Sequence, residues 1–299
     1  LLGAVAGQAV VWYTGQFYTL FFLTRVLKVD AGTANLLLVS ATIITAPLYI
    51  VFGWLSDRVG RKPVFLSGVI MGAVLIIPLF QLLTHFTNPA LERALKETPI
   101  VVSADPAQCS WQFNPVGTAK FTSSCDIAKA SIVGAGLNYQ NQSLPPGSMA
   151  QVKVGDKVIA SYDGTDADAV PKAKEFTSAI SAALKQSGLI AGPANPAEID
   201  TLMVLLVLIA LLTFGTLTFA PTSSMLIELF PSRIRYTALS FPYHLGVAWF
   251  GGFLPAIAFT IVAATGDIYS GLYYPALIAA VSSVVVALLV EGEDVKLVP

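Results

Sequence analysis

The chain of 299 residues is too apolar for an ordinary soluble domain, because 55% of its residues are hydrophobic and its mean hydropathy is +0.71. Its formal net charge of −1 excludes the strongly basic balance that is typical of nucleic-acid-binding proteins. Most charged residues lie between Thr84 and Asp200, and the flanking blocks contain few. We therefore expect an integral membrane protein with one sizeable water-facing insert.

Six apolar runs are long enough to cross a bilayer. A hydrocarbon core of about 30 Å needs about 20 apolar residues in a helix, and a helix satisfies its own backbone hydrogen bonds there. The first run lacks the basic start and the small-residue cleavage site of a signal peptide, so we expect a true span in a chain whose upstream part is missing. The predicted spans cover residues 1–24, 34–55, 64–83, 202–226, 238–264 and 269–290.

Basic residues in the short loops predict the orientation. The loop after the second span has three basic residues within 58–62, and the loop after the fourth span contains Arg233 and Arg235. Alternating spans place both loops on one side of the membrane, which the positive-inside bias makes cytoplasmic. The short loop with Arg25 and Lys28 has the opposite bias. The insert is then expected on the extracytoplasmic side.

The insert, residues 85–200, separates the transmembrane segments 1–84 and 201–299 and is typical of a small α+β domain. Alternating residues on both sides of Gly155-Asp156 predict a β-hairpin. A later segment has helical spacing, with apolar residues at Phe176, Ile180, Ala183 and Leu184.

The two cysteines of the chain, Cys109 and Cys125, both lie in the insert. An oxidising extracytoplasmic space favours a disulfide between them, which would contribute roughly 3 kcal/mol in the entropic model. Two unpaired thiols are the alternative. No CxxC motif or metal-spaced His/Cys cluster accompanies them, so we expect no metal and no cofactor.

The segment GWLSDRVGRKP concentrates charge between the second and third spans. Positive-inside anchoring needs only its basic residues and leaves Asp57 and the glycines unexplained. Gly53 would let another helix approach closely, and Gly60 permits a tight turn. Asp57 can accept hydrogen bonds from a neighbouring helix N-terminus or pair with a nearby arginine. We predict a conformational latch here rather than a plain water-exposed turn, formed by Gly53, Asp57, Arg58, Gly60 and Arg61.

GWLSDRVGRKP resembles the G-x-L-x-D-R-x-G-R-[RK] signature of the major facilitator superfamily, which lies in the cytoplasmic loop between the second and third helices of a six-helix half. The segment ELFPSRIRYTALSFPYHLGVAWFGGFLP resembles the loop and eleventh helix of that family's metabolite:proton symporter branch, which includes carriers of organic acids, shikimate and betaines. In this segment Glu228 opposes the helix macrodipole and needs a cationic partner, unless it is a solvated charge at the membrane rim. The candidate partners are Arg61, Arg233 and Arg235, so the predicted gate also includes Glu228, Arg233 and Arg235.

The resemblance covers all six spans and implies an all-α membrane protein. The spans would be helices seven to twelve, the C-terminal half of a major facilitator fold, with the α+β insert between helices nine and ten. The implied function is secondary active transport by alternating access, as proton-coupled uptake of an organic acid or of a shikimate-like or betaine-like metabolite across a bacterial-type inner (plasma) membrane. The implied partners are the metabolite, protons, the lipid bilayer and the missing N-terminal half. Val247 and Ala248 stand where Asn-Gly would be expected, which puts a polar group of the eleventh helix in doubt.

Polar residues within spans are the candidates for contact with substrate or protons. Gln8, Trp12 and Gln16 recur every four residues on the first span, and they either face substrate or pack between helices. His244 can exchange protons near neutral pH, or it is a hydrogen-bonded structural residue. No carboxylate lies in the middle of a predicted span, so a proton-coupling acid would come from the missing half.

A second function class stays open, a membrane-anchored extracytoplasmic ligand-binding or sensor module in which the insert is the active part. An enzyme is not expected, because the sequence has no metal-spaced His/Cys cluster, no G-x-S-x-G motif and no phosphate loop. Asp163, Asp166 and Asp168 form an acidic turn that would suit either Ca²⁺ or, more simply, a solvated loop.

Overall fold

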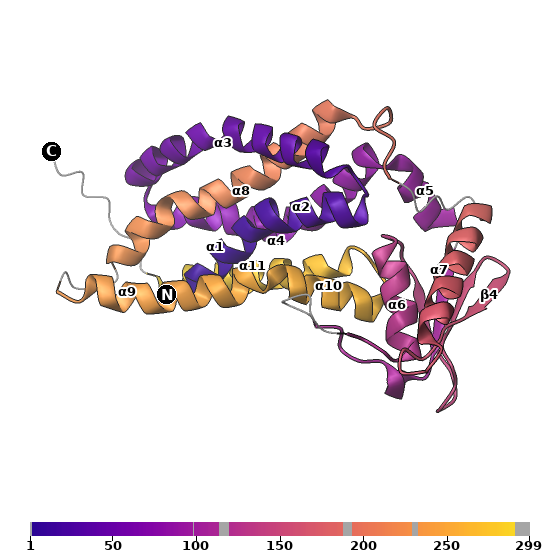
Figure 1. The fold of residues 1–299 in the computed structure, drawn as a ribbon. Coiled ribbons are helices and arrows are strands. Elements are labelled where there is room, and N and C mark those ends of the chain that lie inside the picture. Colours follow the sequence, from indigo (N-terminus) through magenta and orange to yellow (C-terminus); the bar gives the residue numbers. More distant parts are fainter. Residues whose placement is uncertain (1, 98, 114–119, 188–192, 229–232, 291–299) are drawn as a thin grey trace.

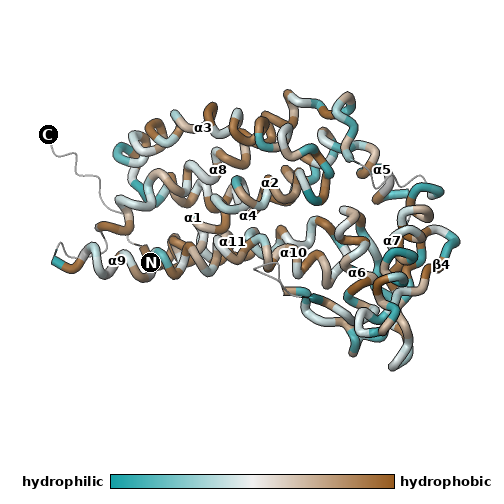
Figure 2. The backbone as a smooth tube through the Cα atoms, viewed as in Figure 1, coloured by the Kyte–Doolittle hydropathy of each residue, from teal (hydrophilic) through white to brown (hydrophobic). Residues whose placement is uncertain are grey.

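The computed structural model describes residues 2–97, 99–113, 120–187, 193–228 and 233–290. A long helical bundle takes up most of the chain, and a smaller domain of helices and strands lies at one end of it (Figure 1). Hydrophobic residues run along the bundle, whereas hydrophilic residues gather in the smaller domain (Figure 2). This arrangement is the one expected for an apolar bundle with a water-facing insert.

Five helical segments in the described part of the chain are long and apolar enough to cross a membrane. They are Ala31–Val59, Arg61–Thr87, Thr201–Ile227, Leu239–Thr265 and Ser270–Leu289, which match the second to sixth predicted spans. The chain is therefore that of a multi-pass membrane protein. The bundle comprises α1 (Leu2–Tyr13), η1 (Thr14–Tyr18), α2 (Thr19–Phe21), η2 (Phe22–Val26), α3 (Ala31–Val59), α4 (Arg61–Thr87), α8 (Thr201–Glu228), α9 (Arg235–Gly246), η4 (Val247–Gly252), α10 (Leu254–Thr265), η5 (Ser270–Leu272) and α11 (Tyr273–Leu289).

The first predicted span forms one helical run from Leu2 to Val26, in which α and π turns alternate. It is not among the five segments that are long and apolar enough to cross a membrane, so the first predicted span stays a prediction. From residue 12 onwards, its partly exposed residues come in pairs every four positions. We call them the open face of the first helical run: Trp12, Tyr13, Gln16, Phe17, Leu20, Phe21, Thr24 and Arg25, followed by Lys28.

The π turns explain why these pairs stay aligned. A step of four residues rotates by about 40° beyond a full turn of an α-helix, so a strict period of four would spiral around it. A π turn closes its hydrogen bonds over five residues and thus takes more residues per turn. The two π segments, η1 and η2, therefore compensate for the rotation and keep the open face on one side.

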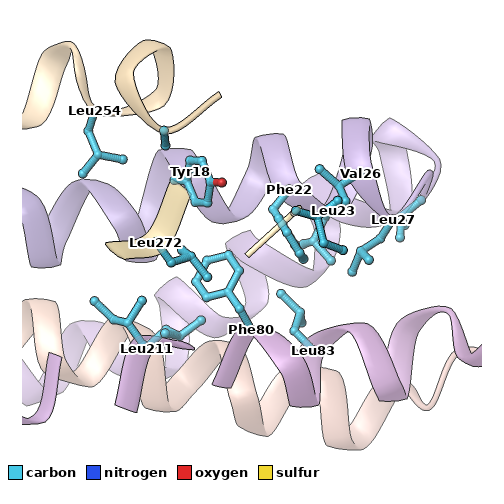
Figure 3. Packing of buried hydrophobic residues seen from close by; sticks show 14 of the residues in the cluster. Tyr18, Phe22, Leu23, Val26, Leu27, Phe80, Leu83, Leu211, Leu254 and Leu272 are labelled. Carbon is cyan, nitrogen blue, oxygen red and sulfur yellow. The ribbon is translucent and has the colours of Figure 1, made fainter. Parts of the chain in front are cut away.

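Close helix contacts bury the opposite side of the first helical run. A Cβ atom at Gly15 would lie 3.2 Å from the carbonyl oxygen of Leu211, so α8 crosses the run at its backbone. Further along, the ring of Tyr18 is fully buried and Phe22 packs edge-on against Phe80 of α4, with ring centroids 4.9 Å apart (Figure 3). From Trp12 onwards, the first helical run thus packs against the bundle core and exposes only its open face.

The smaller domain is an α+β insert between α4 and α8. Its sheet has the strand order β2-β1-β3-β4, with β1 parallel to β2 and antiparallel to β3. The predicted hairpin at Gly155-Asp156 is confirmed as the β3–β4 turn, and the predicted helix is confirmed as α7, with its four apolar positions buried. The elements are α5 (Pro89–Glu97), β1 (Ile100–Ala104), η3 (Pro106–Gln108), α6 (Ser124–Gly134), β2 (Gln140–Ser143), β3 (Gln151–Val154), β4 (Lys157–Ala160) and α7 (Ala169–Gln186).

A disulfide links Cys109 to Cys125, with their Cα atoms 5.2 Å apart. Next to it, the buried carboxylate of Asp126 accepts hydrogen bonds from the amide and hydroxyl groups of Ser110, at 2.9 and 2.7 Å. The disulfide and these hydrogen bonds together hold the segment after η3 against the start of α6.

The insert is hydrogen-bonded to the turn between α10 and α11. The Tyr139 amide donates to the carbonyl of Gly266 at 2.7 Å, and the Tyr139 hydroxyl donates to the carbonyl of Ala263. The Ile268 amide in turn donates to the side-chain oxygen of Asn138 at 2.9 Å. A Cβ atom at Gly266 would lie 2.1 Å from the Tyr139 carbonyl oxygen, so only glycine permits this contact. The insert is therefore bound to the bundle, in addition to its two covalent connections.

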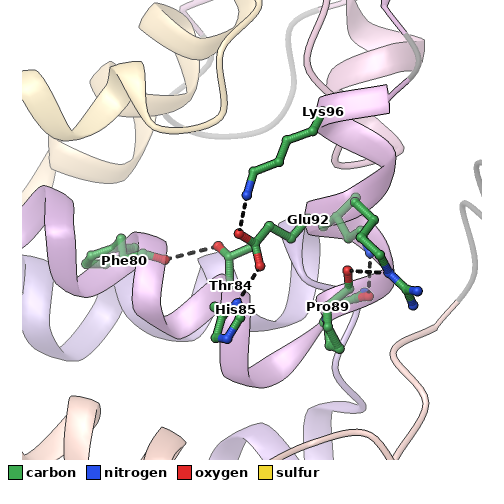
Figure 4. Close-up of polar contacts among 9 residues, drawn as sticks. Phe80, Thr84, His85, Pro89, Glu92 and Lys96 are labelled. Carbon is green, nitrogen blue, oxygen red and sulfur yellow. Dashed lines mark hydrogen bonds and ion pairs between the residues drawn. The ribbon is translucent and has the colours of Figure 1, made fainter.

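A polar cluster joins α4 to α5 at the same end of the bundle (Figure 4). One carboxylate oxygen of Glu92 accepts a hydrogen bond from Lys96 Nζ at 2.7 Å, and the other lies 2.6 Å from His85 Nδ1. The hydrogen bond from Lys96, together with that from His85, holds the pKa of Glu92 below its ordinary value. The cluster thus fixes the corner at which the chain leaves the bundle for the insert.

Candidate functional site

Three aromatic residues from three different helices meet around Trp12. Its indole Nε1 donates a hydrogen bond to the hydroxyl of Tyr49 on α3 at 3.1 Å. The ring of Phe219 on α8 completes the group, with centroid distances of 6.1 Å to Trp12 and 5.9 Å to Tyr49. All three side chains are partly exposed. We call Trp12, Tyr49 and Phe219 the aromatic cluster.

Glycine allows the aromatic cluster to form. A Cβ atom at Gly215 of α8 would lie 3.3 Å from the Trp12 ring and 3.4 Å from its Cα atom. Because Gly215 has no side chain, α8 comes close enough to place Phe219, one turn further on, beside the Trp12 ring.

The aromatic surface continues along the open face. Tyr13 and Phe17 pack against Trp12, with ring centroids 5.2 and 5.8 Å away, and Phe17 is 45% exposed. On its other side the Tyr13 ring contacts η4, where a Cβ atom at Gly251 would lie 2.6 Å from the ring. Tyr13 thus lies next to two π-helical segments. It directly precedes η1 in the chain, and its ring packs on η4. Such segments are frequent at functional sites.

The three residues of the predicted stripe, Gln8, Trp12 and Gln16, differ in their exposure. Trp12 and Gln16 lie on the open face, whereas Gln8 is only 2% exposed and its Oε1 atom has no hydrogen-bond partner among the described residues. Gln8 and Trp12 both lie in α1, where four residues overshoot a full turn by about 40°. Gln8 is therefore turned toward the interior, while its predicted role stays untested.

His244 lies on α9 with an exposed side chain. The Tyr243 ring contacts it edge-on, with centroids 5.7 Å apart. No hydrogen bond joins His244 to another described residue. Its role in proton coupling or substrate contact remains a prediction. The neighbouring Val247 and Ala248 belong to η4.

The predicted latch lies at the end of the bundle opposite the insert. Asp57 and Arg61 are 4.0 Å apart, and the Asp57 side chain is 70% exposed. Arg58 stacks over the Trp54 ring at 4.0 Å. Gly60 joins α3 to α4 with φ of 93°, a conformation that favours glycine.

Gly53 has no close neighbour among the described residues, because a Cβ atom added there would meet nothing within 4 Å. A helix that approaches Gly53 closely would therefore have to come from outside the described residues. Asp57 is exposed in the same turn region, so this part of the latch is open to a further partner.

Lys62 is a latch contact that the sequence did not indicate. Its ammonium group donates to the carbonyl oxygens of Ala287 and Val290, at 2.8 and 2.7 Å, at the end of α11. The latch segment is thereby joined to the last helix of the bundle.

The second part of the predicted gate lies mostly outside the described structure. Glu228 is the last residue of α8, but its side chain, that of Arg235 and residues 229–232 are outside the described atoms. Arg233 is exposed in the turn before α9. The predicted ion pair of Glu228 therefore stays a prediction.

Comparisons with known proteins give one partial similarity. A protein of Staphylococcus haemolyticus named proline/betaine transporter is 34% identical to this chain over 86 residues. The matched stretch covers 29% of the chain and 18% of that transporter. No family model and no solved structure matches the chain.

In the described ranges there is no group of three His, Cys, Asp or Glu residues that could hold a metal ion. In the acidic turn, Lys172 pairs with both Asp166 and Asp168 at 2.9 Å.

Proposed function

We propose that this chain is the C-terminal six-helix half of a secondary active transporter of the major facilitator type. Five apolar helices and the first helical run supply six spans, and the latch segment joins the second to the third. The insert follows the third span, at the position that the family resemblance implies. The partial similarity to a proline/betaine transporter supports a carrier of small molecules.

In this proposal the latch end of the bundle is cytoplasmic and the insert is extracytoplasmic. Basic residues gather in the loop at 58–62, as the positive-inside bias requires, and the disulfide of the insert suits an oxidising compartment. The protein would lie in a bacterial-type inner membrane, with a cytoplasmic gate formed by Asp57, Arg61 and the segment around Glu228.

The observation that carries the proposal is the aromatic cluster of Trp12, Tyr49 and Phe219. The hydrogen bond from Trp12 to Tyr49 joins two helices and holds both partly exposed rings side by side at the bundle surface. Aromatic faces attract cationic groups, and quaternary ammonium ligands are bound in this way. Among the substrate classes that the resemblance implies, the cluster favours a betaine-like solute.

Transport would follow from alternating access. The solute binds between the aromatic cluster and the missing half, and its binding energy favours the closing movement of the two halves against each other. The latch contacts at the cytoplasmic rim form in one state and break in the other. A proton-coupling acid would come from the other half, since the described spans have no carboxylate near their middle.

Uptake of radiolabelled glycine betaine into proteoliposomes tests this function, with the complete protein including its upstream helices. Trp12→Ala should lower kcat/KM by about tenfold or more, because a desolvated cation–π contact contributes about 2 kcal/mol, whereas Trp12→Phe should retain part of the activity. Trp111→Ala is the matched control, since Trp111 is 75% exposed on the insert. If Trp12→Ala takes up glycine betaine as fast as the wild type, the aromatic cluster does not bind the transported solute.

An extracytoplasmic sensor module is the second candidate, and one cavity favours it. A space of about 430 Å³ lies in the insert between β4 and α7, lined in part by Met149, Tyr162 and Phe176. If the complete protein takes up none of the solutes tested, yet shows ligand-induced thermal stabilisation that Met149→Ala abolishes, the sensor function is the better account.

A further inference from the structure

A cavity of about 450 Å³ lies where the insert meets the end of the first helical run. Thr24, Arg25 and Lys28 line it from the first helical run and the loop after it. The remaining walls come from α6 of the insert, the segment before it and α10, with Val133, Gly134, Gln112, Phe259 and Ala263 among the lining residues. The cavity is thus shared by the bundle and the insert.

The charged side chains that line this cavity in the described structure are both basic. Arg25 and Lys28 are the ionisable residues that line it in the described structure, and no carboxylate lines it. Two longer stretches of the insert lie outside the described residues, at 114–119 and 188–192. Neither stretch contains Asp or Glu. Burial, and then the nearby charge of Arg25, lowers the pKa of Lys28. An anion placed between the two cations would relieve this repulsion.

Both cations keep donors available. The Lys28 ammonium donates one hydrogen bond to the Gly134 carbonyl at 2.5 Å, and an ammonium has three donors. The Arg25 guanidinium stacks over Phe21 at 5.6 Å and forms no ion pair with a described residue. A stacked guanidinium still presents its in-plane donors, which match the two oxygens of a carboxylate.

The insert holds Lys28 in a strained conformation. Lys28 is the non-glycine residue with positive φ in the described ranges, at 57°. Its carbonyl accepts a hydrogen bond from the Ala194 amide at 2.9 Å, and the neighbouring Val26 carbonyl lies 2.3 Å from where a Cβ atom of Gly136 would be. Backbone strain of this kind persists only where surrounding structure enforces it, and it is frequent at binding sites.

The cavity lies at one end of the open face. Arg25 follows Trp12 by thirteen residues on the same face, which is about 20 Å along a helix. A small solute could not contact Arg25 and the aromatic cluster at once. It could reach them in succession, along one continuous surface.

We propose that Arg25 and Lys28 form an outer binding site for the carboxylate of the transported solute, at the insert end of the pathway. The proposal rests on the proposed transport function. The solute first binds by its carboxylate in the cavity and then moves along the open face to the aromatic cluster, which takes its cationic group. The insert acts in this scheme as one wall of the outer site.

Glycine betaine uptake by the complete protein in phosphatidylcholine proteoliposomes tests the outer site. The double variant Arg25→Gln/Lys28→Gln should raise KM by about tenfold or more while kcat stays near its wild-type value, because charged hydrogen bonds to the solute are lost. Lys28→Arg should retain the wild-type KM. Arg93→Gln/Lys174→Gln is the charge-matched control, since both side chains are exposed on the insert and neither lines the cavity. An unchanged KM in the double variant overturns the site and leaves the transport function standing.

A binding measurement separates failure of the site from failure of the function. Sodium acetate should raise the melting temperature of the solubilised protein relative to sodium chloride, and the double variant should lose this rise. If uptake is absent but the acetate effect is present and lost in the variant, the anion site stands and the transport function fails. If added phosphatidylglycerol raises the melting temperature of the wild-type protein but not of the double variant, and acetate has no effect on either, the cavity takes a lipid phosphate and the carboxylate proposal is overturned.

Discussion

The ammonium group of Lys62, at the start of α4, donates hydrogen bonds to the carbonyl oxygens of Ala287 and Val290 at the end of α11. The last carbonyls of a helix have no partner within the helix, and a cation there also suits the helix macrodipole. Lys62 therefore joins the latch segment to a helix that is more than two hundred residues away along the chain.

Lys62→Gln should lower the free energy of unfolding by about 1 kcal/mol, the usual net contribution of such hydrogen bonds. The measurement is the thermal midpoint of the purified protein in detergent. Lys174→Gln, an exposed position on α7, removes the same charge and should leave the midpoint unchanged. Equal losses in the two variants would show that the cap of α11 does not contribute to stability.

Asp57→Asn should separate transport from stability. The pair of Asp57 with Arg61 is exposed and 4.0 Å long, so its loss should change the free energy of unfolding by less than about 1 kcal/mol. Initial uptake by the complete protein should nevertheless fall severalfold, if Asp57 meets a partner from the other half in one state of the cycle. Normal initial uptake rates with normal membrane insertion would sink the assignment of Asp57 to the gate.

Gly266→Ala should detach the insert from the α10–α11 turn. Gly266 and Gly147 have similar φ values of 85° and 80°, but an added Cβ would lie 2.1 Å from the Tyr139 carbonyl at Gly266 and meet nothing within 4 Å at Gly147. Gly147→Ala should thus cost only the conformational penalty of about 1–2 kcal/mol. Gly266→Ala should cost more and also speed proteolysis of the insert. Similar proteolysis rates in the two variants would argue against the docked arrangement.

The sequence was sufficient for features that depend on local pattern. Five apolar helices, the hairpin at Gly155-Asp156 and the buried positions of α7 follow from apolar length, turn chemistry and helical period. These signals lie within short windows of the chain, so no knowledge of the tertiary fold is needed to find them.

Features that depend on contacts between distant segments could not be found in this way. Tyr49 follows Pro47 within α3 and Phe219 lies in an apolar run, so neither shows in one sequence that it will meet Trp12. The different exposure of Gln8 and Trp12 could not be predicted for another reason. The stripe's period of four persists on one face only where π turns occur, and a single sequence gives no clear signal for where α-helix changes to π-helix.

Stability of the insert corner should depend on the protonation of Glu92. The hydrogen bond from Lys96, and a second contact with His85, place the pKa of Glu92 below its ordinary value in the folded protein. A carboxyl group with a lowered folded-state pKa stabilises the fold when it is ionised, above its unfolded pKa. This contribution is lost as the pH falls below about 4, through the lowered pKa of the folded state.

Glu92→Gln should therefore flatten the acid side of the stability profile. The melting temperature of the variant should lie below that of the wild type at neutral pH, and the two should converge as the pH falls through the lowered pKa of Glu92, where the wild-type carboxylate becomes protonated as well. Glu97→Gln, in the last turn of α5 and without a resolved contact to a cation, is the matched control and should follow the wild-type profile. A constant difference between Glu92→Gln and wild type at every pH would mean that packing, rather than ionisation of Glu92, stabilises the corner between α4 and α5.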